Sequence, residues 1–313
     1  MFQRHGIARR ISTRDATRYH GNVPYPLDAQ MRASTLSLLG SIWKKLPQGI
    51  ARARSWGADW CDWSEPFVHV ENGEVVAHVG VMEIAVTLDG RARTLAGIHA
   101  VCTHPAHRGR GLLRATLTRA LAWVDARYDT AVLWANDREI YRRFGFVAHA
   151  ESVFTMAVAA PSPAASSSPR QLSLDDPADV RLLRDRLAAR APVSRRCGSR
   201  EPGWLALVDL ALSPAPGPTL ARLPELDSVV AYVMEGRTLL LHDVIAPRMP
   251  SLAALVPLLG VDADAVRVFF SPDDLGAAAL AAGPTPLDDF LMVRGAPLLD
   301  RNEPFAFSPL TRC

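Results

Sequence analysis

The chain has 313 residues, which is more than one hydrophobic core usually serves, so we expect two domains. Hydrophobic residues make up 49% and charged residues 21% of it, a composition typical of a globular protein. The net charge of +3 is too small to indicate a nucleic-acid-binding protein.

The cysteine spacing and the N-terminal residues indicate in which cellular compartment the protein is expected. Cys61, Cys102, Cys197 and Cys313 are scattered without CxxC spacing, so neither a disulfide framework nor a metal site is predicted. Residues 1–14 carry charges but no apolar signal segment, and no stretch approaches the roughly eighteen apolar residues of a membrane span. We therefore expect a cytoplasmic protein with no membrane and no nucleic-acid partner. The sequence leaves open whether it forms a homo-oligomer.

The first predicted element is an amphipathic helix over residues 28–45, which we expect Pro47 to end. Trp56, Trp60 and Trp63 follow it within a short segment. Aromatic clusters are more often part of a core than of a substrate pocket. We therefore interpret the tryptophans as a hydrophobic plug at a sheet end, with the lining of an acceptor pocket as the alternative.

Antiparallel strands are predicted next. Residues 67–70 and 75–81 flank Asn72-Gly73, and Asn-Gly supplies the positive φ angles of a type I′ turn. A second turn at Asp89-Gly90 returns the chain into a strand at 98–103. The order is therefore one helix followed by three antiparallel strands.

A basic, glycine-rich loop follows that strand. It reads His107-Arg108-Gly109-Arg110-Gly111, and a helix opens close to Gly111 because apolar residues then recur at helical spacing. Such a loop presents free backbone amides and the positive end of a helix dipole at one place, which suits a pyrophosphate. Alone, the motif would equally fit a solvated basic turn or a nucleic-acid contact.

A strand at 131–134 and a tyrosine-bearing turn complete the pattern. Three motifs, Val101-x-Thr103-x-Pro105, Arg108-x-x-Gly111 and Tyr141-x-x-x-Gly145-Phe146, occur in this order. Together they resemble the acetyl-CoA site of the GNAT superfamily of N-acetyltransferases. HRGRGLLRA and AND-x-x-IYRRFGF are most similar to the Eis-type (enhanced intracellular survival) branch, which shares the leucine at position 113 where most of the superfamily has Gly or Ala.

The resemblance implies acetyl-CoA as co-substrate and direct transfer of its acetyl group to a primary amine, without a metal. Amides of residues 109–114 would hold the pyrophosphate, with Arg108 and Arg110 adding charge. The backbone of Val101 and Thr103 would pair with the pantetheine arm, and an amide near Val101 would face the oxyanion. The residues implied for the cofactor are Val101, Cys102, Thr103, Arg108, Gly109, Arg110, Gly111, Leu112, Leu113, Arg114 and Asn136.

Tyr141 is the implied general acid, since a phenol of pKa about 10 can protonate a leaving thiolate. Packing on the sheet is its alternative role. The base is left open between two groups. Strand alternation would put His99 on the same face as Val101 and Thr103, and a histidine pKa suits proton removal. Eis-type enzymes use the C-terminal carboxylate, here that of Cys313, although we expect this chain to stop before their sterol-carrier-like domain.

The domain boundary is predicted from composition. Residues 152–159 are expected to form the closing strand of the first domain, and a Pro-, Ser- and Ala-rich linker follows it. We therefore divide the chain into a catalytic acetyl-CoA-binding domain at residues 1–160, a linker at 161–170 and a second domain at 171–313.

The second half repeats the strand, turn, strand, helix order of the first and is predicted to be a diverged copy. The expected elements are strands at 229–234 and 238–245, a helix at 252–259, a strand at 266–270, a helix at 273–282 and a last strand at 290–293. Arg248-Met249-Pro250-Ser251 replaces the glycine-rich loop, and proline offers no amide. We therefore expect this copy to bind no cofactor.

The predicted fold class is α/β, with a mixed sheet in each of two GNAT-like domains in tandem, the second degenerate. The predicted function is acyl-CoA-dependent N-acetyl transfer to a primary amine of a small molecule or a protein. Two alternatives remain, an aminoacyl or longer-acyl transferase of the same architecture and a non-catalytic CoA-binding regulatory module. Neither the acceptor amine nor the acyl chain can be read from the sequence.

Overall fold

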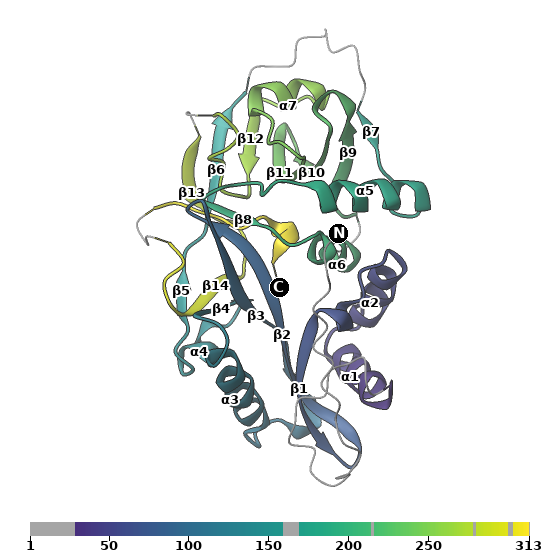
Figure 1. The fold of residues 1–313 in the computed structure, drawn as a ribbon, viewed down its shortest axis with the longest axis vertical. Helices are drawn as coiled ribbons and strands as arrows, with labels where there is room; N and C mark the ends of the chain where they lie inside the picture. The colour runs from purple at the N-terminus through teal and green to yellow at the C-terminus, as the bar shows by residue number, and fades with distance from the viewer. Residues whose placement is uncertain (1–28, 159–168, 214–215, 278–279, 300–302, 313) are drawn as a thin grey trace.

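A computed structural model describes residues 29–158, 169–213, 216–277, 280–299 and 303–312. It contains two sheets of seven strands each, one toward either end of the molecule (Figure 1). Four helices share one buried core with both sheets: α1 (Ala29–Ile42), α2 (Leu46–Ser55), α5 (Pro177–Ala189) and α6 (Trp204–Leu212). The outer face of the first sheet packs against α3 (Leu112–Asp125), and that of the second against α7 (Leu252–Leu258). No helix in the described ranges is long and apolar enough to cross a membrane.

The first sheet follows the order β1-β2-β3-β4-β14-β5, and β8 pairs with the end of β2. Its strands are β1 (Ser64–Glu71), β2 (Glu74–Leu88), β3 (Arg91–Thr103), β4 (Thr130–Ala135), β5 (Val147–His149), β8 (Cys197–Ser199) and β14 (Phe290–Gly295). β3 and β4 are parallel, and the other neighbours are antiparallel. The predicted hairpin turn is confirmed, because Asn72 and Gly73 have φ angles of 52° and 81°.

The second sheet follows the order β13-β6-β12-β11-β10-β9-β7. Its strands are β6 (Ser152–Ala157), β7 (Arg170–Gln171), β9 (Thr219–Leu223), β10 (Ser228–Glu235), β11 (Thr238–Ile245), β12 (Ala265–Val268) and β13 (Ala281–Pro284). Here β11 and β12 are the parallel pair. The strands predicted at 229–234, 238–245 and 266–270 are confirmed as β10, β11 and β12, and the helix at 252–259 as α7.

The two halves of the chain exchange one strand each. In sheet order, β1-β2-β3-β4-β14-β5 corresponds to β9-β10-β11-β12-β6-β13, so the strand next to the last comes from the opposite half. The prediction that residues 152–159 close the first domain is therefore wrong, because β6 pairs with β12 and β13. The predicted strand at 290–293 exists, but it lies in the first sheet between β4 and β5. A boundary near residue 160 does not separate the sheets.

The exchange is accompanied by a shared core. One cluster of buried apolar side chains combines the inner faces of both sheets with residues of α1, α2, α5 and α6. Leu39 of α1, Val86 of β2, Leu183 of α5, Leu207 of α6 and Val229 of β10 all belong to it. Because these residues come from both halves, neither half can bury its inner face without the other.

Two predicted helices need correction. α1 ends at Ile42, and Pro47 lies in the first turn of α2, where its missing N–H is not needed, so Pro47 begins a helix and does not end one. Residues 273–276 form turns in place of the helix predicted at 273–282. There the carboxylate of Asp273 accepts the backbone N–H groups of Arg195, at 2.9 Å, and Arg196, at 3.1 Å. A tertiary contact has overridden the local helical pattern.

We predict that a cavity in the donated strand β14 destabilises the whole molecule. Met292 is fully buried in the core between the first sheet and α3, so Met292→Ala should lower the free energy of unfolding by about 2–5 kcal/mol. Urea unfolding followed by tryptophan fluorescence and circular dichroism should show one shifted transition. Val147→Ala on β5, an exposed site, should change stability by less than about 0.5 kcal/mol. Two separate transitions would contradict the shared core.

Candidate active site

The parallel strands β3 and β4 separate soon after they meet. They pair at Ala96 with Ala131 and at Gly97 with Val132, and the described structure has no further pairing between them. The rest of β3, residues 98–103, therefore lies beside an opening at the carboxyl end of β4. Ligands of open α/β sheets bind at such ends, and unpaired strand edges can pair with an extended ligand.

A β-bulge reverses the direction of the side chains along β3. Ala100 has a φ of 49°, and the register with β2 shifts opposite it. As a result His99 lies against the indole of Trp60, with the ring centroids 5.0 Å apart, whereas Val101 packs on the α3 side. The prediction that His99 shares a face with Val101 and Thr103 is wrong, because it assumed unbroken strand alternation.

His99 is a packed, neutral side chain. Its Nε2 lies 2.9 Å from Ser64 Oγ, and a Cβ atom at Gly80 would come within 2.4 Å of its ring. Burial, and secondly the nearby His78, hold the pKa of His99 well below its usual value. An imidazole in this environment is a weak proton acceptor, so the geometry favours a structural role for His99.

The glycine-rich loop is open to a ligand. Gly109 and Gly111 have φ angles of 76° and 75°, and a Cβ at either position would meet nothing within 4 Å. Gly111 is the N-cap of α3, and the first helical hydrogen bond runs from Ala115 N to Gly111 O. The amides before Ala115 have no partner within the helix. We call the backbone amides of residues 109–114 the amide nest.

The side chains that follow Gly111 differ in how deeply they are buried. Leu112 is buried against Val76 and Ala77, Leu113 is half-buried and Arg114 is exposed. This packing fixes the start of α3 while leaving its amides accessible.

The two arginines of the loop differ in their partners. The guanidinium of Arg110 donates two hydrogen bonds to the Glu71 carboxylate, at 2.9 and 2.8 Å, and this pairing lowers the pKa of Glu71. Arg108 donates from Nε to the Thr103 carbonyl, at 3.4 Å. The charge of Arg110 is thus already matched by a carboxylate, whereas Arg108 has a neutral partner.

One polar atom beside the opening lacks a partner. The hydroxyl of Thr103, at the end of β3, is buried and makes no hydrogen bond within the described residues. Buried hydroxyls are nearly always hydrogen-bonded in a finished structure. Together with the amide nest, this orphaned group fits an extended polar ligand such as the pantetheine and pyrophosphate of an acyl-CoA.

Tyr141 lies on α4 (Arg138–Arg142), whose first turn is capped by the Asp137 carboxylate accepting the Glu139 N–H at 2.9 Å. Its ring packs edge-on against Phe146, with centroids 6.1 Å apart, and is 9% exposed. Burial, followed by Asp137 and Cys102, raises the pKa of Tyr141 to about 12. No described residue makes a hydrogen bond to its hydroxyl, which is therefore protonated and available.

A cavity of ≈ 690 Å³ lies on the face of the first sheet opposite α3. We call it the tryptophan-lined cavity, because Trp43, Trp60 and Trp134 contribute to its lining. His99 and Ala100 of the bulge form one side, and α6 forms another. Of the clustered tryptophans, Trp60 both belongs to the core and lines this cavity, Trp56 is a core residue and Trp63 stacks on Trp204.

The other predicted site residues fall as follows. Asn136 follows β4, lines the tryptophan-lined cavity and donates to the Asp288 carbonyl at 3.3 Å. Cys102 is buried, and burial raises the pKa of its thiol to about 12, which makes it a poor nucleophile. Cys313 lies outside the described residues. No group of three or more metal-ligating side chains gathers within the described parts of the chain.

Sequence reasoning missed α6 and its aspartate. The segment Trp204–Leu212 reads WLALVDLAL, in which Asp209 is the sole charged residue. Asp209 lines the tryptophan-lined cavity, and no described residue donates a hydrogen bond to its carboxylate. A single acid within a short apolar run was the available signal, since such a group needs a partner or a function.

In the second sheet, the corresponding opening is filled by the chain itself. β11 and β12 pair as far as Leu241 and Val268, and segment 305–311 then lies between them. Ser308 Oγ donates to the His242 carbonyl at 3.1 Å, and Ser271 N donates to the Ala306 carbonyl at 3.1 Å. Protein backbone thus occupies the position that the first sheet leaves open.

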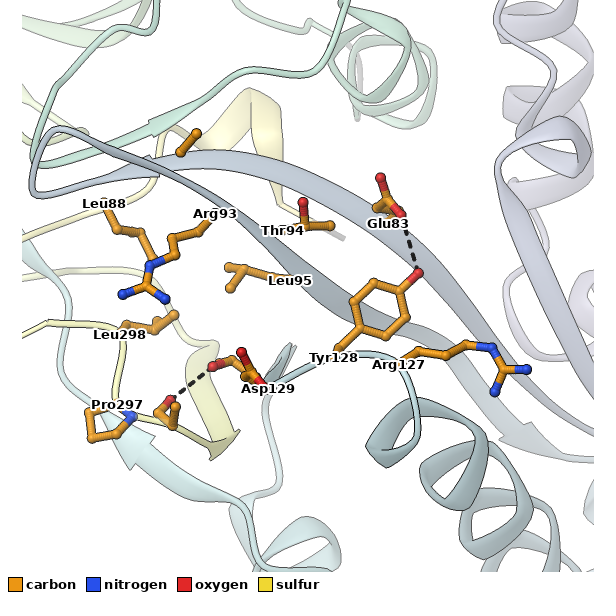
Figure 2. Close-up of a pocket in the computed structure, with 13 residues that line it drawn as sticks. Glu83, Leu88, Arg93, Thr94, Leu95, Arg127, Tyr128, Asp129, Pro297 and Leu298 are labelled. Carbon is orange, nitrogen blue, oxygen red and sulfur yellow. Dashed lines mark hydrogen bonds between the residues drawn. The ribbon is translucent and has the colours of Figure 1, made fainter. Parts of the chain in front are cut away.

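A second cavity, of ≈ 590 Å³, lies at the amino ends of β3 and β4 (Figure 2). Figure 2 shows Tyr128 beside it, donating from its hydroxyl to the Glu83 carboxylate at 3.3 Å. Arg93 and Arg127 also line this cavity. It lies at the end of the strands away from the amide nest, so it is not part of the candidate site.

Comparison with known proteins agrees with this geometry. Residues 37–148 match a family model described as an acetyltransferase (GNAT) domain. No curated protein matches the chain in sequence. Among solved structures, a probable N-acyltransferase of unknown function from Enterococcus faecalis shares 17% identity and a TM-score of 0.56, over 86% of this chain and 71% of that one.

Two further structures extend the comparison. A GCN5-related N-acetyltransferase from Anabaena variabilis shares 15% identity and a TM-score of 0.51, over 85% of this chain and 71% of that one. Eis1 from Mycobacterium abscessus shares 21% identity and a TM-score of 0.46, over 73% and 63%. The Enterococcus and Anabaena proteins share a fold that continues beyond residues 37–148 into the second half.

We predict that Gly111→Glu abolishes acetyl-CoA binding, because it places a side chain and a negative charge at the amide nest. Calorimetric titration with acetyl-CoA should give no measurable heat. Gly236→Glu is the matched control, since Gly236 also has a positive φ, of 57°, and open space, but lies in the turn between β10 and β11. Unchanged affinity in a folded Gly111→Glu protein would exclude the nest as the binding site.

We predict one acetyl-CoA per chain, because segment 305–311 fills the opening of the second sheet. Titration at saturation should give a stoichiometry near one. Two bound equivalents would show that this segment can be displaced.

Proposed function

Because residues 37–148 match a family model described as an acetyltransferase (GNAT) domain, we propose that the chain transfers an acetyl group from acetyl-CoA to a primary amine. One observation carries the proposal: the amide nest and Tyr141 lie on one side of the opening between β3 and β4, and the tryptophan-lined cavity lies on the other. A cofactor and an acceptor could therefore approach the same strands from opposite faces. Their reacting groups would meet beside Ala100.

The residues that would hold acetyl-CoA follow from the site. The amide nest would bind the pyrophosphate with backbone N–H groups, and the exposed Arg108 and Arg114 would add charge. The free edge of β3 at Val101 and Cys102 would pair with the pantetheine arm, and Thr103 would gain a partner for its hydroxyl. Asn136 would contact the arm from the end of β4. Acetyl-CoA, when bound, supplies the activated acetyl group.

Tyr141 is proposed as the general acid. Its hydroxyl stays protonated across the physiological range because its pKa lies near 12, and it has no competing partner among the described residues. The departing thiolate, whose conjugate acid has a pKa of about 8.5, is a weaker base than the tyrosinate. The phenol would therefore stabilise the thiolate by a hydrogen bond as the carbon–sulfur bond breaks, and solvent would restore any proton that it gives up. The position of Tyr141 on α4, directly after β4, supports this role. The tests below address the length of the acyl chain and the identity of the acceptor.

We predict that Tyr141→Phe lowers kcat by about 10² to 10⁴ and leaves the affinity for acetyl-CoA nearly unchanged, because it keeps the ring and removes one proton. Steady-state kinetics and calorimetry measure the two quantities. Tyr128→Phe is the matched control, since Tyr128 also has a pKa near 12 but lies at the other cavity. A kcat within a few-fold of wild type would mean that another group protonates CoA.

The function itself is tested by thiol release from acetyl-CoA in the presence of an amine panel. We expect CoA release that depends on an added amine and yields the acetylated product by mass spectrometry. Release with a longer-acyl CoA in preference to acetyl-CoA would favour a different acyltransferase. Tight binding of acetyl-CoA without any transfer would favour a regulatory module.

A further inference from the structure

The tryptophan-lined cavity has an apolar interior. Beside its three indoles, the lining includes aliphatic side chains from α2, β2 and α6: Leu46, Met82, Leu205, Val208 and Leu212. A volume of ≈ 690 Å³ is within the range of small-molecule sites. Flat, rigid rings such as indoles gain most from contact with another flat apolar group. The cavity therefore suits a compact ligand with an apolar body.

The charged side chains in the interior of this cavity are Asp209, Asp289 and Arg312, and of these only Asp209 lacks a hydrogen-bond partner among the described residues. Asp289 accepts a hydrogen bond from Arg312 at 3.1 Å, and Arg312 also forms an ion pair with Glu151 at 3.1 Å. Lys44 and Lys45 are exposed at the junction of α1 and α2. Asp209, by contrast, has no hydrogen-bond donor among the described residues.

We infer, on the premise of the proposed acetyl transfer, that Asp209 binds the amino group of the acceptor and removes its proton, and that the acceptor is a monoamine with an apolar, preferably aromatic, body. Arg312 acts on Asp209 only through space, and an ammonium group would give Asp209 the hydrogen-bonded charge partner that the described residues do not supply. Lys44, Lys45 and Arg312 oppose a second or third positive charge, which excludes polycationic amines as preferred acceptors.

The protons and electrons balance without a further reactant. Asp209 takes one proton from the ammonium group, which leaves the nitrogen lone pair free. Nitrogen then bonds to the acetyl carbon, the carbon–sulfur bond breaks, and Tyr141 donates its proton to the sulfur. The proton that nitrogen loses on forming the amide passes to solvent through the open mouth of the cavity. Solvent also takes the proton from Asp209 and restores the proton of Tyr141, so both side chains return to their starting states.

The environment of Asp209 suits a base. Burial, only partly offset by Arg312, raises the pKa of Asp209 to about 7. A base with a pKa near the working pH combines adequate strength with substantial deprotonation. The other titratable or charged groups that line the cavity are Lys44, Lys45, His99, Asp289 and Arg312. Of these, His99 is held neutral by burial.

The first test compares acceptors and variants in the full chain. With 2-phenylethylamine and spermidine as probes, kcat/KM for 2-phenylethylamine should be higher by at least about tenfold, because a buried aromatic ring adds binding energy. Asp209→Asn should lower kcat/KM for 2-phenylethylamine by about 10² to 10⁴, and Asp209→Glu should recover part of it. Asp185→Asn, on the exposed face of α5, is the charge-matched control and should behave as wild type.

The pH profile distinguishes a base from a structural carboxylate. Only the deprotonated form of Asp209 can take a proton, so kcat/KM of the wild type should rise with pH through about 7. Asp209→Asn should lose this rise. The assignment of the base is overturned if kcat/KM of the wild type changes by less than about threefold between about pH 5.5 and 8.5, or if Asp209→Asn shows the same rise.

Failure of the proposed function can be told apart from failure of this inference by measuring 2-phenylethylamine binding directly, by calorimetry. Binding that is lost in Asp209→Asn, without acetylation in a protein that binds acetyl-CoA, refutes the transferase but supports the amine site. Acetylation of spermidine in preference to 2-phenylethylamine, or unchanged activity of a folded Asp209→Asn variant, overturns the inference while the transferase stands. Absence of both binding and acetylation of 2-phenylethylamine overturns the acceptor class.

Discussion

The rest of the structure depends on the pairing of β14 with β4 and β5. This strand comes from the second half of the chain, yet it fills the first sheet beside the strand that borders the candidate site. β6 makes the reciprocal contact in the second sheet. Backbone hydrogen bonds are obligatory for buried strands, so neither sheet is complete without the other half. α6 follows β8, which pairs with the end of β2, and it brings Asp209 to the cavity on the first sheet.

A single irregular residue then separates the two faces of the site. With Ala100 in the left-handed region, β3 directs His99 toward Trp60 and Val101 toward α3. The same bulge lies where β3 has left β4, so the sheet is open at the point where its side chains change face. The proposed acetyl transfer would need such a place, because its two substrates would have to meet without competing for one pocket.

The parts that could be predicted from the sequence were those with local causes. Asn72-Gly73 fixes a turn, and Gly109 and Gly111 fix a loop, since each needs a positive φ angle. The partner of β6 could not be predicted, because strand periodicity does not identify the sheet that a strand joins. The predicted direction of the His99 side chain was wrong for a related reason. A bulge at an alanine has no sequence signal, because alanine also occurs in regular strands. Asp209 was missed because it is the sole polar residue of α6, so no polar face marks the segment as an amphipathic helix.

Segment 305–311 contacts both sheets at the positions where ligands would bind. It occupies the gap between β11 and β12, while Pro309 and the following Arg312 line the tryptophan-lined cavity on the other sheet. A change that opened this gap between β11 and β12 would therefore also move the residues that shape the tryptophan-lined cavity. The two sheets are coupled through this one segment, so substitutions at the ends of β11 and β12 should affect a site on the opposite sheet.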